Sequence, residues 1–138
     1  MNEAASITAI LKTSKTIAVV GLSSNRYRAS NGVSRYMQGA GYRIIPVNPG
    51  ETEVLGEKAY PTLESIPEKV DIVNVFRRPE YVPDIVDSAI RIGARSLWLQ
   101  EEVVHEEAAG RAEQSGLAVV MDRCLLKEHH RLSESGEL

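Results

Sequence analysis

Short apolar runs alternate along the chain with segments in which apolar residues recur three and four positions apart. The second run, Ile44 to Val47, does not alternate with polar residues, which favours a parallel strand buried on both faces. Glycine, proline and polar clusters separate these runs. We therefore predict five strands, at Thr16–Val20, Tyr42–Val47, Asp71–Phe76, Ser96–Leu99 and Leu117–Met121.

The segments between these runs have helical periodicity. After Pro79, whose missing N–H suits the first turn of a helix, an apolar stripe continues to Ile90 and Gly93 ends it. Helices are predicted at Ser6–Thr13, Asn31–Ala40, Pro79–Ile92 and His105–Ser115, with another short helix in the tail. The polar stretch Glu51–Pro67 is predicted to be a connection with a helical turn near Thr62–Ser65.

Strands that alternate with helices indicate parallel strands joined by right-handed crossovers. The predicted fold class is α/β: a Rossmann-like parallel five-stranded sheet, in the order 3-2-1-4-5, with helices on both faces. The length favours a single domain, residues 1–138. Sheets of this kind bind ligands at the carboxyl ends of their strands, near the point where the strand order reverses. All five predicted ends carry polar or charged groups.

Composition narrows the classes of partner. A net charge of -3 argues against a general nucleic-acid binder, and no apolar run approaches the roughly 20 residues of a membrane helix. Met1 to Lys15 has none of the features of a signal peptide. A single cysteine, Cys124, cannot form an intramolecular disulfide and fits a reducing compartment. We expect a cytoplasmic protein, and the sequence leaves its protein partner and oligomeric state open.

The loop after the first strand, Gly21-Leu22-Ser23, is a candidate phosphate site. Loop N–H groups and a helix N-terminus attract anions, and Arg28 and Ser30 lie close by in the sequence. A dinucleotide fingerprint would have a second glycine where Ser23 stands, and an NAD site would have an acidic residue in place of Asn48. Both departures weaken the case for NAD and leave phosphate binding possible. A merely tight turn without a ligand remains the alternative.

Other polar residues show no catalytic pattern. Arg77 and Arg78 follow the third strand, where they could clamp a phosphate or remain a solvated pair. Glutamate pairs near His105 fit a solvated helix start, and His105 itself could cap that helix. No metal site is predicted, because no cysteine or carboxylate stands at ligand spacing from a histidine. Cys124 has no identifiable base, and Trp98 is expected in the core.

Taken together, the segments resemble the CoA-binding-domain family, small stand-alone proteins similar to the nucleotide-binding domain of the succinyl-CoA synthetase α subunit. The resemblance covers nearly the whole chain and rests on Val20–Ser23, Arg28–Ser30, Gly41–Pro49, Val54–Gly56, Val70–Val73, Val75–Arg77, Ser96–Gln100 and Val119–Cys124. Two positions depart from the family pattern. Glu102 stands where glycine is common, and Ala29 where proline is common.

The resemblance implies that the ligand is coenzyme A, with its phosphates and adenosine over the first loop and the neighbouring strand ends. The residues implied to bind it are Gly21, Leu22, Ser23, Arg28, Ser30, Val47, Asn48, Pro49, Phe76, Arg77 and Arg78. The synthetase relatives use a phosphorylated histidine on another domain and an ATP-grasp partner, and neither is present in this sequence. We therefore expect a protein that binds CoA or acyl-CoA without catalysis of its own. The alternatives are an NAD(P)-binding enzyme or sensor, and a subunit that completes an acyl-CoA synthetase in trans.

Overall fold

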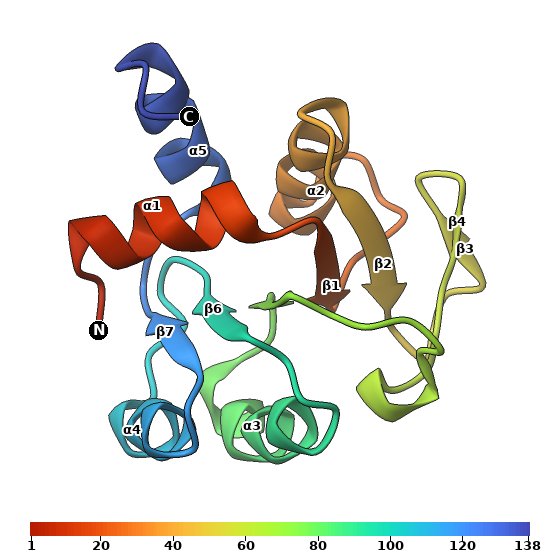
Figure 1. Ribbon diagram of the computed structural model, residues 1–138. Coiled ribbons are helices and arrows are strands. Elements are labelled where there is room, and N and C mark those ends of the chain that lie inside the picture. Colours follow the sequence, from red (N-terminus) through yellow and green to blue (C-terminus); the bar gives the residue numbers. More distant parts are fainter.

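A five-stranded parallel sheet with helices on both faces forms the centre of the computed structural model, which describes all residues from 1 to 138 (Figure 1). The sheet strands are β1 (Thr16–Val20), β2 (Arg43–Val47), β5 (Ile72–Val75), β6 (Ser96–Leu99) and β7 (Ala118–Val120). The helices are α1 (Ala4–Thr13), α2 (Ala29–Gly39), α3 (Val82–Arg91), α4 (Glu106–Gln114) and α5 (Leu125–Glu134). The predicted α/β class is confirmed, and each predicted sheet strand is found within one residue of its predicted ends.

The strand order is β2-β1-β5-β6-β7, and an isolated parallel bridge between Val47 and Tyr60 extends it beyond β2. If the elements are numbered along the chain and the Tyr60 bridge counts as the third, the sheet from this bridge to β6 has the Rossmann order 3-2-1-4-5. β7 is then a sixth element, next to β6. The predicted strand at Asp71–Phe76 is therefore the fourth element, and it lies beside β1 rather than beyond β2. Pro61 has no N–H to donate, so pairing at the outer position ends after Tyr60. The order reverses between β1 and β5.

The connection between β2 and β5 carries more structure than the sequence indicated. It contains a short antiparallel hairpin, β3 (Glu53–Val54) and β4 (Glu57–Lys58), which the sequence analysis missed. The predicted helical turn is present as the 3₁₀ helix η1 (Leu63–Ser65), capped by Thr62. A second 3₁₀ turn, η2 (Pro79–Tyr81), leads into α3, so the helix predicted from Pro79 begins with this tighter turn.

Two apolar layers hold the sheet between the helices. Successive strand residues point to opposite faces, so Ala18 and Val20 of β1 pack with α3 and α4, whereas Ile17 and Val19 pack with α1, α2 and α5. Burial on both faces explains why the strand sequences do not alternate with polar residues. Trp98 of β6 is fully buried, as predicted, and its indole N–H donates to the carbonyl of Arg123 at 2.9 Å.

The tail helix α5 is fixed to α2 through a small aromatic cluster. The Tyr36 hydroxyl hydrogen-bonds Nδ1 of His129 at 2.8 Å, and the imidazole meets the rings of Tyr36 and Tyr42 edge to face at 5.4 and 5.7 Å. His129 is thus a packed side chain, although it lies in a tail helix rich in charged residues. Burial, with a smaller contribution from His130, lowers its pKa.

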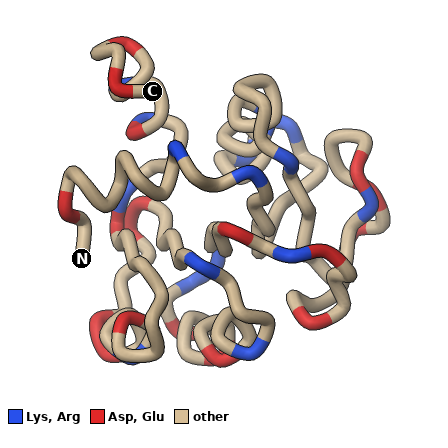
Figure 2. The backbone as a smooth tube through the Cα atoms, viewed as in Figure 1, with Lys and Arg blue, Asp and Glu red and all other residues tan.

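None of the helices has both the length and the apolar composition that crossing a bilayer requires. Figure 2 shows charged residues of both signs spread along the chain, unlike the single basic face of a duplex-binding protein.

Folding stability should fall with acidification because of His129. Its pKa in the folded protein is lowered from 6.5, so the unfolded chain takes up the proton at higher pH, and stability present above pH 6.5 is lost as the pH falls below that value. We expect urea unfolding at pH 7.5, 6.5 and 5.5 to show a smaller loss for His129→Gln than for the wild type. His130→Gln is the control and should keep most of the loss, because burial is the larger cause of the shift. Equal pH dependence in the wild type and His129→Gln would contradict this account.

Candidate functional site

A cavity of about 1030 Å³ opens at the carboxyl end of the sheet, where the strand order reverses. Its wall comes from the loops that follow β1, β5, β6 and β7, together with the first turns of α2. Seven of the predicted binding residues line it: Gly21, Ser23, Arg28, Ser30, Phe76, Arg77 and Arg78. This is the position at which parallel α/β sheets bind ligands.

The β1–α2 loop is held in shape by the first turn of the helix that follows it. The N–H of Ser23 donates to Oγ of Ser30 at 3.1 Å, and the side-chain amide of Asn31 donates to the carbonyl of Ser23 at 2.9 Å. Ser30 and Asn31 are both buried. The N–H groups of Ala29 and Ser30, at the start of α2, donate no hydrogen bond within the protein, although both residues line the cavity. Free N–H groups at a helix start are an anion-binding feature.

Gly21 allows this loop to leave β1 directly against β5. Its φ is +88°, and a Cβ built there would lie 2.4 Å from the carbonyl oxygen of Phe76. The N–H of Gly21 still bonds the carbonyl of Val47 at 2.8 Å, while the N–H of Phe76 bonds the carbonyl of Val20 at 2.9 Å. No side chain fits between the two strand ends, so glycine is required by space as well as by conformation.

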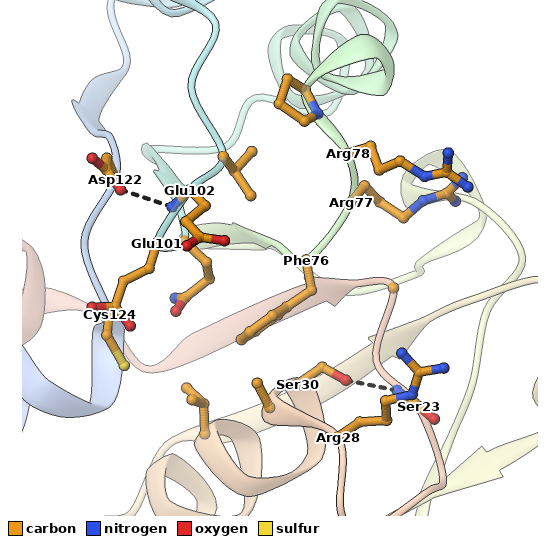
Figure 3. A pocket seen from close by; sticks show the side chains of 16 residues that line it. Ser23, Arg28, Ser30, Phe76, Arg77, Arg78, Glu101, Glu102, Asp122 and Cys124 are labelled. Carbon is orange, nitrogen blue, oxygen red and sulfur yellow. Dashed lines mark hydrogen bonds between the residues drawn. The ribbon is translucent and has the colours of Figure 1, made fainter.

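Three arginines lie on one side of the cavity, with Phe76 between them and the opposite side (Figure 3). The Arg28 side chain is exposed and forms no ion pair, and Arg78 is only 3.7 Å from Glu80 in an exposed pair. The guanidinium of Arg77 stacks over the Tyr81 ring at 4.1 Å from its centroid. None of the three positive charges is tied up in a buried ion pair, so all remain free to meet an anion.

The opposite side is acidic and was not among the predicted binding residues. Glu101, Glu102 and Asp122 line it, with Gln100 and Cys124 beside them. The N–H of Glu102 donates to Oδ1 of Asp122 at 2.7 Å, which joins the β6–α4 loop to the β7–α5 loop. The strand-end rule could have indicated these residues, since Gln100-Glu101 and Asp122-Arg123 end two predicted strands.

Glu102 and Asp122 both have left-handed backbone conformations, with φ of 71° and 60°. Such a conformation costs a residue with a side chain about 1–2 kcal/mol. Glycine at position 102 would avoid this strain. Glu102 therefore adds a negative charge to the cavity wall and strains the backbone at that position.

Chemically, the cavity offers charged and polar binding groups but no recognisable catalytic pair. No histidine lines it, and His105 is instead the N-cap of α4, where its Nδ1 accepts from the N–H of Ala108 at 3.1 Å, as predicted. Cys124 is half-buried at the start of α5. Gln100, also lining the cavity, is buried and donates to Oδ1 of Asn74 at 2.7 Å. No group of three or more His, Cys, Asp or Glu side chains is arranged to hold a metal ion.

Four residues named in the sequence analysis lie outside the cavity wall. Leu22 and Val47 are buried in the core, and Pro49 is exposed beyond the edge of β2. Asn48 uses its side chain to hold the turn, donating to the carbonyl of Leu22 at 3.1 Å and accepting from the N–H of Gly50 at 2.9 Å. For Val47, Asn48 and Pro49 the reason is the strand order, because β2 lies on the far side of β1 from the reversal. Leu22 belongs to the loop after β1, but its side chain is fully buried.

The sequence model of the CoA binding domain matches residues 15–130. The chain belongs to the CoA binding domain family. The resemblance proposed from the sequence is confirmed.

Three relatives illustrate the family. YneT of Bacillus subtilis (strain 168) is 46% identical over 125 residues, which cover 91% of this chain and 93% of YneT. The structure of a hypothetical protein from Pyrococcus horikoshii OT3 superposes with a TM-score of 0.92 at 39% identity, covering 95% of this chain and 92% of that one. The ADP-forming acetate–CoA ligase I of Archaeoglobus fulgidus is 26% identical over 121 residues, which are 80% of this chain but only 18% of the ligase.

Substitution of Gly21 should destabilise the protein. We expect Gly21→Ala to lower the free energy of unfolding by about 2–4 kcal/mol, because alanine meets both an unfavourable φ and the Phe76 carbonyl. Gly32→Ala in α2 is the matched control: apart from the backbone of its own helix, no atom lies within 4 Å of the added Cβ, and we expect a gain of about 0.5–1 kcal/mol from helix propensity. Urea unfolding measures both, and a Gly21→Ala variant as stable as the wild type would refute the close-approach argument.

Proposed function

We propose that this protein binds coenzyme A or an acyl-CoA in the cavity at the carboxyl end of its sheet, without catalysing acyl transfer by itself. The observation that carries the proposal is the convergence of Arg28, Arg77 and Arg78 with the free N–H groups of α2 at one cavity wall. Membership of the CoA binding domain family supports the choice of ligand.

The chemistry of coenzyme A matches this wall. Its pyrophosphate and ribose phosphate carry several negative charges, which helix N–H groups and guanidinium groups bind through charge-assisted hydrogen bonds. The pyrophosphate belongs near the N–H groups of Ala29 and Ser30. The exposed arginines then take the remaining phosphate charge, and Phe76 offers an aromatic face. The cavity volume of about 1030 Å³ is at the upper end of ordinary ligand pockets, as a ligand of this size requires.

The NAD alternative has weaker support. An NAD site of the usual kind has a carboxylate at the end of the second strand that accepts from the ribose hydroxyls. Here that position is Asn48, whose side chain already bonds the loop at Leu22 and Gly50. Ser23 also stands in place of the glycine that would let a pyrophosphate approach the backbone closely.

The non-catalytic part of the proposal rests on the residues of the cavity wall. An acyl-transfer site needs a nucleophile next to a base. Cys124 is the nucleophile of the wall, but His129 and His130 are absent from the cavity lining and His105 caps another helix. No hydrogen bond joins Cys124 to a carboxylate of the wall: Glu101 accepts from Lys127, and Asp122 accepts from the N–H of Glu102. The other charged groups are arginines, which are suited to binding and orientation.

Arginine substitutions test the binding proposal. We expect Arg28→Ala and Arg77→Ala each to weaken CoA binding by about 1–3 kcal/mol, measured by calorimetry on protein stripped of nucleotide. Added salt should reduce this difference in binding free energy between variant and wild type, because it screens the exposed charges. Arg95→Ala is the matched control: Arg95 is exposed and absent from the cavity wall, so its loss should leave the affinity unchanged. CoA should also raise the Tm of the wild type much more than NAD does. Equal Tm shifts with CoA and NAD, or unchanged CoA affinity in both cavity variants, would contradict the proposal.

A second candidate is a subunit that completes an acyl-CoA synthetase in trans. It is favoured by one observation: the chain aligns with only 18% of an acetate–CoA ligase, so that enzyme carries this domain among others. In such an arrangement the ATP site and the phosphorylated group would come from a second protein.

Turnover assays separate the two candidates. We expect the purified chain with CoA, ATP, Mg²⁺ and acetate to form no acetyl-CoA above a no-protein control, because the cavity wall contains no histidine to carry a phosphoryl group. Acetyl-CoA that forms only when the chain is combined with a lysate fraction, and that is lost with Arg28→Ala, would favour the subunit role. Acetyl-CoA formed by the chain alone and surviving repurification would overturn the non-catalytic proposal.

A further inference from the structure

The cavity wall is divided by charge, and the division follows the strand order. The arginines come from the loops that follow β1 and β5, whereas the carboxylates come from the loops that follow β6 and β7. Since the sheet runs β1-β5-β6-β7, the two sets stand at opposite sides of the same cavity. Figure 3 shows the arginine side chains on one side, Glu101, Glu102 and Asp122 on the other, and Phe76 between them.

Two of the three carboxylates have no ion-pair partner. Lys127 pairs with Glu101 at 3.0 Å and so offsets that charge. Glu102 and Asp122 form no salt bridge, and both residues are exposed to the cavity solvent. The N-terminus of α5 begins just after Cys124, but a helix end contributes only about half a positive charge. The nearest other cation is Arg123, whose guanidinium donates to the backbone carbonyl of Asp122 at 2.8 Å and lies 4.0 Å from Glu128. Even with Lys127 and Arg123 counted against the three carboxylates, the acidic side keeps a net negative charge.

This division orients a ligand that is charged at one end only. Coenzyme A carries its phosphates at the nucleotide end, while its pantetheine arm and thiol are uncharged. Like charges repel, so the phosphates avoid Glu102 and Asp122 and take the arginine side. In that orientation the arm would cross the apolar residues of the wall, Phe76 and Val103, and the thiol with any acyl group would face the carboxylates.

We propose, on the basis of the proposed CoA binding, that Glu102 and Asp122 select the acyl group by charge. The site takes free CoA and thioesters of uncharged or cationic acids, and it discriminates against acyl groups that end in a carboxylate. A dicarboxylic monothioester would bring a further negative charge to a side where neither Glu102 nor Asp122 has a salt-bridge partner.

A matched pair of CoA thioethers tests the selection. S-butyl-CoA and S-carboxypropyl-CoA have arms of equal length, and they differ only by a terminal methyl or carboxylate group. Both resist hydrolysis during calorimetry. We expect the wild type to bind the carboxylate probe at least roughly tenfold more weakly at low salt, about 1.4 kcal/mol. Because the charges are exposed, the ratio between the dissociation constants of the two probes should decrease as salt is added.

Charge variants identify the residues responsible. The double variant Glu102→Gln with Asp122→Asn removes both charges, and asparagine at 122 keeps an oxygen to accept from the N–H of residue 102 and tolerates a positive φ. We expect its ratio between the two probes to fall to about threefold or less. The control double variant, Glu53→Gln with Glu134→Gln, changes the net charge equally at exposed positions outside the cavity wall and should keep the wild-type ratio.

The outcomes are distinct. A large ratio in the wild type and control, together with a small ratio in the cavity variant, supports selection by Glu102 and Asp122. Equal binding of the two probes by the wild type, or the same ratio in all three proteins, overturns the selection while leaving CoA binding itself established. Failure of CoA and both probes to bind the wild type refutes the proposed function, and the selection with it.

Discussion

The contact between the ends of β1 and β5 is the constraint from which the site follows. At Gly21 the chain leaves β1 with a positive φ, so close to the Phe76 carbonyl that a Cβ would lie 2.4 Å from that oxygen. The hydrogen bonds of both strand ends survive this approach, so the sheet stays intact to its last residue. The loop that leads to Arg28 and the loop that carries Arg77 both start from this point. Their mutual position, and hence the anion-binding wall, depends on the absence of one side chain.

The electrostatics of the cavity are a consequence of topology. A parallel sheet brings every strand's carboxyl end to one edge, and the order of the strands then decides which loops become neighbours. Two basic loops meet at the reversal between β1 and β5, and two acidic loops meet at β6 and β7. The hydrogen bond from Glu102 to Asp122 ties the acidic loops together. A small protein of net charge -3 thereby presents a local cationic surface to a polyanion.

The far wall of the cavity depends on α5, a helix distant from the phosphate loop in the sequence. Trp98 holds the start of this segment by donating to the carbonyl of Arg123, and the Tyr36–His129 contact fixes the helix against α2. Cys124 and Asp122 are positioned by these two anchors. His129 therefore belongs to the helix that follows the acidic loop, although its side chain lies outside the cavity wall.

Local sequence determined the elements and the chemistry of the first loop. Apolar runs located the strands, and the glycine, serine and arginine residues after β1 and β5 could be recognised because each acts near its own strand end. The family resemblance was also readable in sequence, and so was the capping role of His105. Only the tertiary structure decided which strand ends are adjacent. In the folded chain Asn48 and Pro49 lie outside the cavity wall, and Leu22 and Val47 are buried in the core. Three residues that were not predicted line the wall: Glu101, Glu102 and Asp122. The physical reason is that packing between segments far apart in the chain sets the place of each strand in a parallel sheet. The sequence pattern within one segment carries no information about that packing.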